Sequence, residues 1–211
     1  GGHQTKVPIT IADFFLFVRT QNAKYNGNGS AGGRRDCAVA SLCFFAVKRV
    51  SEVLAVRRDQ VTKTERGFLV TITRQKNRPD ATTAFIPFAE NLEFCPGTLL
   101  ERWITEFDSR GDTNASDHLF CTTRNKAGCR PTRLSASSFR SSVDKVFGNK
   151  LISTHSFRKG GCQWLISLGL SRGQVQHIGG WLVSSSMDNQ PTHHHVVQKL
   201  ASTCSRNVFG L

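Results

Sequence analysis

Apolar side chains recur at the spacing of an α-helix along most of this 211-residue chain. Their period of three to four residues predicts helices wherever polar positions occupy the opposite face. The strongest pattern covers residues 36–56, where Asp36 is the expected N-cap of one long buried helix. Further helices are predicted over residues 9–24, 97–107, 135–147 and 154–168, after Ser171, and from Ser184 to a break near Pro191.

Between residues 57 and 88 the pattern changes to alternation with period two, which is typical of strands. Two alternating runs, residues 68–72 and 84–88, flank a basic turn at residues 74–80. This arrangement predicts a small antiparallel sheet with a projecting basic hairpin. A further short strand is predicted at residues 118–121.

These elements predict a mainly α-helical α+β fold in one domain. A chain of this length can bury a substantial core without being divided. Residues 1–8, which begin with two glycines, are expected to be a cloning remnant or a linker. Residues 9–211 are expected to form the domain itself.

The charge of the chain points to a polyanionic partner. Lysine and arginine together number 28 against 15 acidic residues, which gives a net charge of +13 and a pI near 10.0. A charge of this size repels itself unless a polyanion neutralises it, and nucleic acid is the usual one. The basic residues recur throughout the chain, which favours nucleic acid over a basic protein without such a partner.

Composition argues against several other classes of protein. Hydrophobic residues make up 38% of the chain, as in globular domains, and no run of 18 apolar residues predicts a membrane span. Neither region of a signal peptide is visible at the N-terminus. The seven cysteines are scattered without a Cys-x-x-Cys pair, so we expect free thiols in a reducing compartment. His193, His194 and His195 would point three ways from a helix, and neither a metal nor a cofactor is expected.

One stretch carries most of the candidate chemistry: THSFRKGG at residues 154–161, followed by a helical run and GGW at residues 179–181. His155 and Arg158 are three residues apart and share one helix face. Together with Trp181 they offer a proton-transfer group, a forked cation and an indole N–H donor. These are the groups that hold and work on a phosphodiester.

Arg49 is the second candidate, because it lies inside the apolar stretch of residues 36–56. A buried arginine is costly unless it is paired or meets an anion. Glu52, three residues on, could be its structural partner. Alternatively, Arg49 binds a phosphate.

The stretch HSFRKGGCQWLISLGLSRGQVQHIGGW resembles the catalytic domain of the tyrosine recombinases, the phage-integrase family. The amino-acid sequence of this stretch is most similar to the branch of the family that is carried by eukaryotic mobile elements of the DIRS and Crypton kinds. RVSEVL, which begins at Arg49, resembles the first-arginine motif of that family. The resemblance covers about residues 10–200 and implies a mainly helical catalytic domain with a small antiparallel sheet. It also implies an enzyme that breaks and rejoins DNA through a tyrosine.

The resemblance implies a role for each candidate residue. Arg49 and Arg158 would hold the non-bridging oxygens of the phosphate. His155 would transfer protons and contact the phosphate. Lys76, in the basic hairpin, would protonate the leaving oxygen, and Trp181 would donate a hydrogen bond to the phosphate.

The nucleophile that the resemblance implies is missing. The family carries its tyrosine on the helix after Trp181, where Gln190 stands nearest the expected position, and the one tyrosine of this chain is Tyr25. A carboxamide cannot replace a phenol in attack on phosphate. Three explanations stay open: an inactivated relative that still binds DNA, a substituted tyrosine, or a serine among residues 184–186 acting instead.

Double-stranded DNA is the expected partner, self-association on DNA through the C-terminal segment is left open, and no membrane is expected. The protein is expected to be intracellular and DNA-associated, and nuclear in a eukaryotic host. The alternative functions are a non-catalytic DNA-binding module derived from the recombinase fold, or a basic RNA- or protein-binding domain, which would lack the usual base-stacking strands. The residues expected along the DNA backbone are Arg74, Arg78, Arg124, Lys126, Arg130, Arg133 and Lys159.

Overall fold

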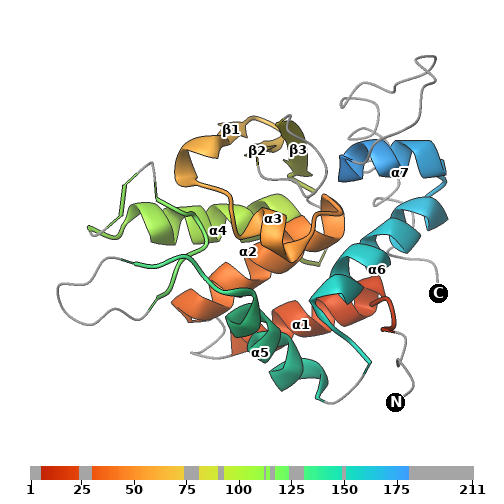
Figure 1. The fold of residues 1–211 in the computed structure, drawn as a ribbon, viewed down its shortest axis with the longest axis horizontal. Helices are drawn as coiled ribbons and strands as arrows, with labels where there is room; N and C mark the ends of the chain where they lie inside the picture. The colour runs from red at the N-terminus through yellow and green to blue at the C-terminus, as the bar shows by residue number, and fades with distance from the viewer. Residues whose placement is uncertain are drawn as a thin grey trace.

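The fold is mainly helical, with a small sheet on one side of a helical body (Figure 1). The computed structural model describes residues 6–23, 30–73, 81–89, 93–111, 113–114, 117–123, 131–148 and 151–180. The helices within these ranges are α1 (Ile11–Ala23), α2 (Ala31–Phe45), α3 (Val50–Val53), α4 (Pro96–Asp108), α5 (Ala136–Phe147), α6 (Thr154–Ser167) and α7 (Arg172–Gly179), with a 3-10 turn at Arg58–Gln60. The strands are β1 (Val61–Thr64), β2 (Gly67–Ile72) and β3 (Thr82–Pro87).

Helix α2 forms the centre of the domain and packs against α1, α4 and α6. Twelve of its fifteen residues are buried, which is typical of a helix surrounded by other elements. Aromatic rings fill the space between α2 and its neighbours: Phe14 of α1 and Trp164 of α6 both contact Phe44 and Phe45. The core therefore joins the two segments that carry the candidate arginines.

The prediction of one helix over residues 36–56 is wrong in two respects. Helix α2 begins five residues earlier, where the Ser30 hydroxyl oxygen accepts a hydrogen bond from the Gly33 amide at 3.0 Å. It ends at Phe45, and Val47 follows with a φ of +55°. The Lys48 amide then donates back to the Leu42 carbonyl at 3.4 Å, which satisfies one of the carbonyls near the end of the helix.

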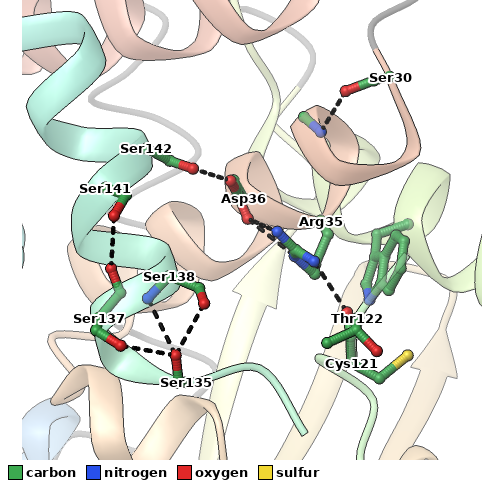
Figure 2. Close-up of polar contacts among 12 residues, drawn as sticks. Ser30, Arg35, Asp36, Cys121, Thr122, Ser135, Ser137, Ser138, Ser141 and Ser142 are labelled. Atoms are coloured by element: carbon green, nitrogen blue, oxygen red, sulfur yellow. Dashed lines mark hydrogen bonds and ion pairs between the residues drawn. The ribbon is translucent and has the colours of Figure 1, made fainter. Parts of the chain in front are cut away.

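Asp36 is not a cap but part of a buried network inside α2 (Figure 2). Its Oδ1 accepts from Nε and Nη2 of Arg35 at 2.9 and 2.7 Å, and its Oδ2 accepts from the Ser142 hydroxyl of α5 at 2.5 Å. The third bond of the Arg35 guanidinium goes to the Cys121 carbonyl at 3.0 Å. Because every charge in the network is hydrogen-bonded, it can lie in the interior and join α2 to α5 and to the Cys121 segment.

The predicted antiparallel sheet is confirmed, with strand order β1-β2-β3. Ile72 pairs with Thr82, so the basic hairpin leaves the sheet at the end of β2 and returns at the start of β3. The strand predicted at residues 118–121 is not formed. That segment instead makes isolated bridges, one from His118 to Arg57 and one from Cys121 to Arg133.

Helix α6 lies unusually close to the backbone of two other segments. A Cβ placed on Gly161 would lie 1.9 Å from the Phe44 carbonyl oxygen of α2, and one on Gly160 would lie 2.0 Å from the Ile9 carbonyl oxygen. Real side chains do not approach backbone atoms to these distances, so both positions require glycine. The Ile9 amide also donates to the Ser156 carbonyl at 3.2 Å.

We expect Gly161→Ala to destabilise the domain by about 3 kcal/mol or more, because neither backbone can move without disrupting the core. Gly173→Ala in α7 is the matched control, since its Cβ would come no closer than 3.9 Å to another atom, the Ser171 hydroxyl oxygen. That substitution should stabilise the protein by about 0.5–1 kcal/mol, through better helix propensity. Urea unfolding measures both changes, and equal effects at the two positions would contradict the assignment of Gly161 to a close contact.

Candidate phosphate-binding site

Arg49 stands at the N-cap of the one-turn helix α3, directly after the turn that ends α2. Glu52, at the third position of α3, bonds to it twice: Oε2 accepts from the Arg49 amide at 2.8 Å and Oε1 accepts from Nη1 at 2.7 Å. The Glu52 side chain is 5% exposed and that of Arg49 is 31% exposed. The structural pair with Glu52 is therefore present, and part of the guanidinium that it fixes still faces solvent. Phosphate binding by Arg49 stays a prediction.

The second arginine lies on the first half of α6. His155 is exposed in the first turn, and Arg158, one turn later, is half-buried. The buried glycines follow one turn further on: Gly161 packs against α2 and Gly160 packs against the Ile9 segment. The residues that pack α6 against α2 thus also determine which way His155 and Arg158 face.

The two arginines act on one another electrostatically. Burial, followed by the neighbouring Arg49 guanidinium, lowers the pKa of Arg158 from its ordinary value, and Glu52 opposes the shift. The Glu52 carboxylate, which bonds to Arg49, thus also acts on the Arg158 guanidinium through space. An anion that bound there would relieve the repulsion between the two cations. Phosphate suits such a pair, because guanidinium groups donate bidentate hydrogen bonds to its oxygens.

Two residues predicted along the DNA backbone are also described. The Lys159 ammonium lies 3.4 Å from the Lys6 carbonyl oxygen, on the exposed side of α6. The Arg133 guanidinium donates to the Ser51 carbonyl of α3 at 3.2 Å. The other predicted residues lie outside the described residues: Lys76, Trp181, Gln190, Arg74, Arg78, Arg124, Lys126 and Arg130.

Two cysteines near Arg158 were not singled out from the sequence. Burial raises the pKa of the Cys43 thiol of α2, and it also raises the pKa of Cys162, one turn beyond Arg158 on α6. Both groups therefore stay protonated thiols that pack beside the guanidinium. Cys37, Cys43, Cys95 and Cys162 are free thiols, as the scattered spacing predicts.

Neither a metal-binding cluster nor a membrane span occurs in the part of the chain that the structure describes. No three His, Cys, Asp or Glu side chains gather there around a common point. None of the helices in the same ranges combines the length and the apolarity that crossing a bilayer requires.

Several solved structures of DNA recombinases share this fold. XerH site-specific recombinase bound to its difH substrate has a TM-score of 0.62 and 15% identity, over 85% of this chain and 48% of that one. XerA recombinase has a TM-score of 0.62 and 14% identity, over 96% and 60%. A lambda integrase dimer bound to a COC′ core site has a TM-score of 0.57 and 10% identity, over 100% and 52%. This chain thus spans about half the length of XerH and of lambda integrase.

The architecture is therefore that of the tyrosine-recombinase catalytic domain. Residues 20–196 match the model of the phage integrase family, so the match covers most of the chain. The protein belongs to the phage integrase family of tyrosine recombinases. No curated protein sequence matches the chain.

We expect Glu52→Gln to destabilise the fold by about 1–3 kcal/mol, because the partly buried Arg49 and Arg158 would lose their shared counter-charge. Asp144→Asn is the matched control. Asp144 pairs with Arg140 at 2.7 Å on the surface of α5, where such a pair contributes at most about 0.5 kcal/mol. The free energy of unfolding in urea measures both variants. A Glu52→Gln protein as stable as Asp144→Asn would contradict the role of Glu52.

Proposed function

We propose that this chain is the catalytic domain of a mobile-element recombinase that retains the phosphate-binding part of its active site and lacks the tyrosine nucleophile. The observation that carries the proposal is the proximity of Arg49 and Arg158, beside the buried Glu52 carboxylate that bonds to Arg49. A DNA phosphate that bound between the two guanidinium groups would relieve the repulsion between them.

The proposed roles follow from the chemistry of each group. Arg49 and Arg158 bind the non-bridging oxygens of the scissile phosphate and stabilise the charge that develops during strand breakage. His155, exposed one turn before Arg158, contacts the phosphate and transfers protons. We assign proton donation to the leaving oxygen to Lys76 and a hydrogen bond to the phosphate to Trp181.

A non-catalytic DNA-binding module is the second candidate function. It is favoured by one fact of the sequence: Tyr25 is the one tyrosine of the chain, and Gln190 stands where the recombinase nucleophile is expected. The two functions share DNA binding and differ in covalent chemistry. Self-association on DNA and a nuclear location remain part of the proposal for either function.

The first test is DNA binding. We expect affinity for duplex DNA to show little sequence preference and to fall steeply with salt, with a log–log slope of several units. Arg158→Gln should weaken binding about 10- to 100-fold, because it removes a charge-assisted contact to phosphate. Arg19→Gln is the control, since Arg19 pairs with Glu93 at an exposed site of α1. A flat salt response, or equal losses in the two variants, would refute the proposal.

The second test restores the nucleophile. If only the phenol is missing, then Gln190→Tyr should give a covalent protein–DNA adduct on a nicked suicide substrate, and the slow uncatalysed background makes even a small yield visible. Asn189→Tyr and Pro191→Tyr cover the neighbouring positions, because Pro191 alters the local backbone. A gel that separates adducts from free protein gives the readout. Intact DNA binding with no adduct from any of the three would favour the binding module.

A further inference from the structure

The single turn α3 leaves one carbonyl group outside its backbone hydrogen bonds. The carbonyls of Val50, Glu52 and Val53 accept from the amides of residues 54, 55 and 56 in turn. The Ser51 carbonyl is skipped, and Nη2 of Arg133 donates to it at 3.2 Å. The Arg133 guanidinium, from a segment far along the chain, thus donates to a helix carbonyl that has no backbone partner. Positive charge is favoured beside such carbonyls.

The backbone that carries Arg133 is itself tied to the central helix. The backbones of Arg133 and Cys121 form an isolated antiparallel β-bridge, and the Leu134 amide donates to the Phe120 carbonyl at 2.8 Å. The Cys121 carbonyl in turn accepts from Arg35 of α2, in the buried network that Figure 2 shows. Arg133 therefore reaches α3 from a position fixed to α2 and not from a separate loop.

Helix α3 is consequently held by two sets of side-chain bonds. Glu52 bonds to the amide and the guanidinium of Arg49, and Arg133 bonds to the Ser51 carbonyl. A single turn has little stability of its own, so its position depends on the burial of Val50 and Val53 in the core and on these bonds. We infer that Arg133 is a positioning residue, which holds the Arg49 guanidinium in place for phosphate instead of binding the phosphate itself. The inference rests on the proposed function, in which the Arg49–Arg158 pair binds a DNA phosphate.

A double-mutant cycle on DNA binding separates positioning from direct contact. Duplex affinity and its salt slope would be measured for the wild type, Arg133→Gln, Arg133→Lys, Arg49→Gln and the double variant Arg49→Gln/Arg133→Gln. We expect Arg133→Gln to weaken binding about 5- to 10-fold without changing the salt slope. Arg133→Lys should recover part of the affinity, because an ammonium can donate to the same carbonyl. In the Arg49→Gln protein, Arg133→Gln should add less than about a two-fold loss, since its target is already gone.

Each of the opposite results would overturn the inference. A salt slope lower by about one unit in Arg133→Gln, with losses that multiply in the double variant, would make Arg133 a direct phosphate ligand. Arg140→Gln removes the same charge from α5. An equal loss of duplex affinity in that variant would mean that the effect of Arg133→Gln comes only from the change in net charge. A wild-type protein that binds no DNA would refute the proposed function instead. Amide hydrogen exchange still tests the role of Arg133 in that case, because it needs no DNA.

Amide hydrogen exchange tests the structural step directly in the free protein. Arg133→Gln should lower protection of the Leu54 and Ala55 amides, whose bonds close α3, and leave the α4 amides unchanged. Arg133→Lys should restore much of that protection. Unchanged exchange at Leu54 and Ala55 would show that Arg133 does not hold the turn, whatever the outcome with DNA.

Discussion

The close contact between α6 and α2 decides where the candidate site lies. Gly160 and Gly161 let the α6 backbone reach the carbonyl oxygens of Ile9 and Phe44, at distances that no side chain tolerates. Contact at backbone level fixes the helix in rotation as well as in distance, because the two consecutive glycines pack against two different segments. Arg158 lies one turn before Gly161, beside the contact with α2, so its position near Arg49 follows from the packing. The two glycines of the THSFRKGG stretch therefore position the helix that carries Arg158, and they need no contact with a ligand for that role.

Electrostatics then defines what this geometry can bind. Burial, followed by repulsion from the neighbouring Arg49 guanidinium, lowers the pKa of Arg158 from its ordinary value. Several other arginines of the described residues form one-to-one pairs with carboxylates at exposed sites, such as Arg58 with Asp108 or Arg57 with Asp59. Such pairs are already neutral and offer little to an anion. Two neighbouring guanidinium groups, Arg49 and Arg158, distinguish the candidate site from these pairs.

The sequence predicted the helices and the sheet well, because hydrophobic periodicity reports directly on burial. It failed at residues 45–50, where the helix ends at Phe45 and Val47 follows in a left-handed conformation that a β-branched residue rarely adopts. Val47 is held there by packing against Leu165 and Val175, a tertiary effect with no local signal. Asp36 was misread as a cap for the same reason, since its partner Ser142 lies far along the chain. The pair Arg49–Glu52 was predictable, because both partners lie within one turn.

No tyrosine stands near Gln190 in the sequence, and phosphate binding and nucleophilic attack depend on different residues of the proposed site. Arg49, Glu52 and Arg158 are positioned by α2, α3 and α6, and the buried carboxylate that holds Arg49 lies within α3 itself. Loss of a phenol would remove the attack on phosphorus and leave the attraction for the phosphate in place. The members of a catalytic site act as a unit for turnover, but ground-state binding of phosphate needs only the cations and their support. A recombinase domain can therefore lose its reaction in one substitution while the physical basis of its DNA binding stays intact.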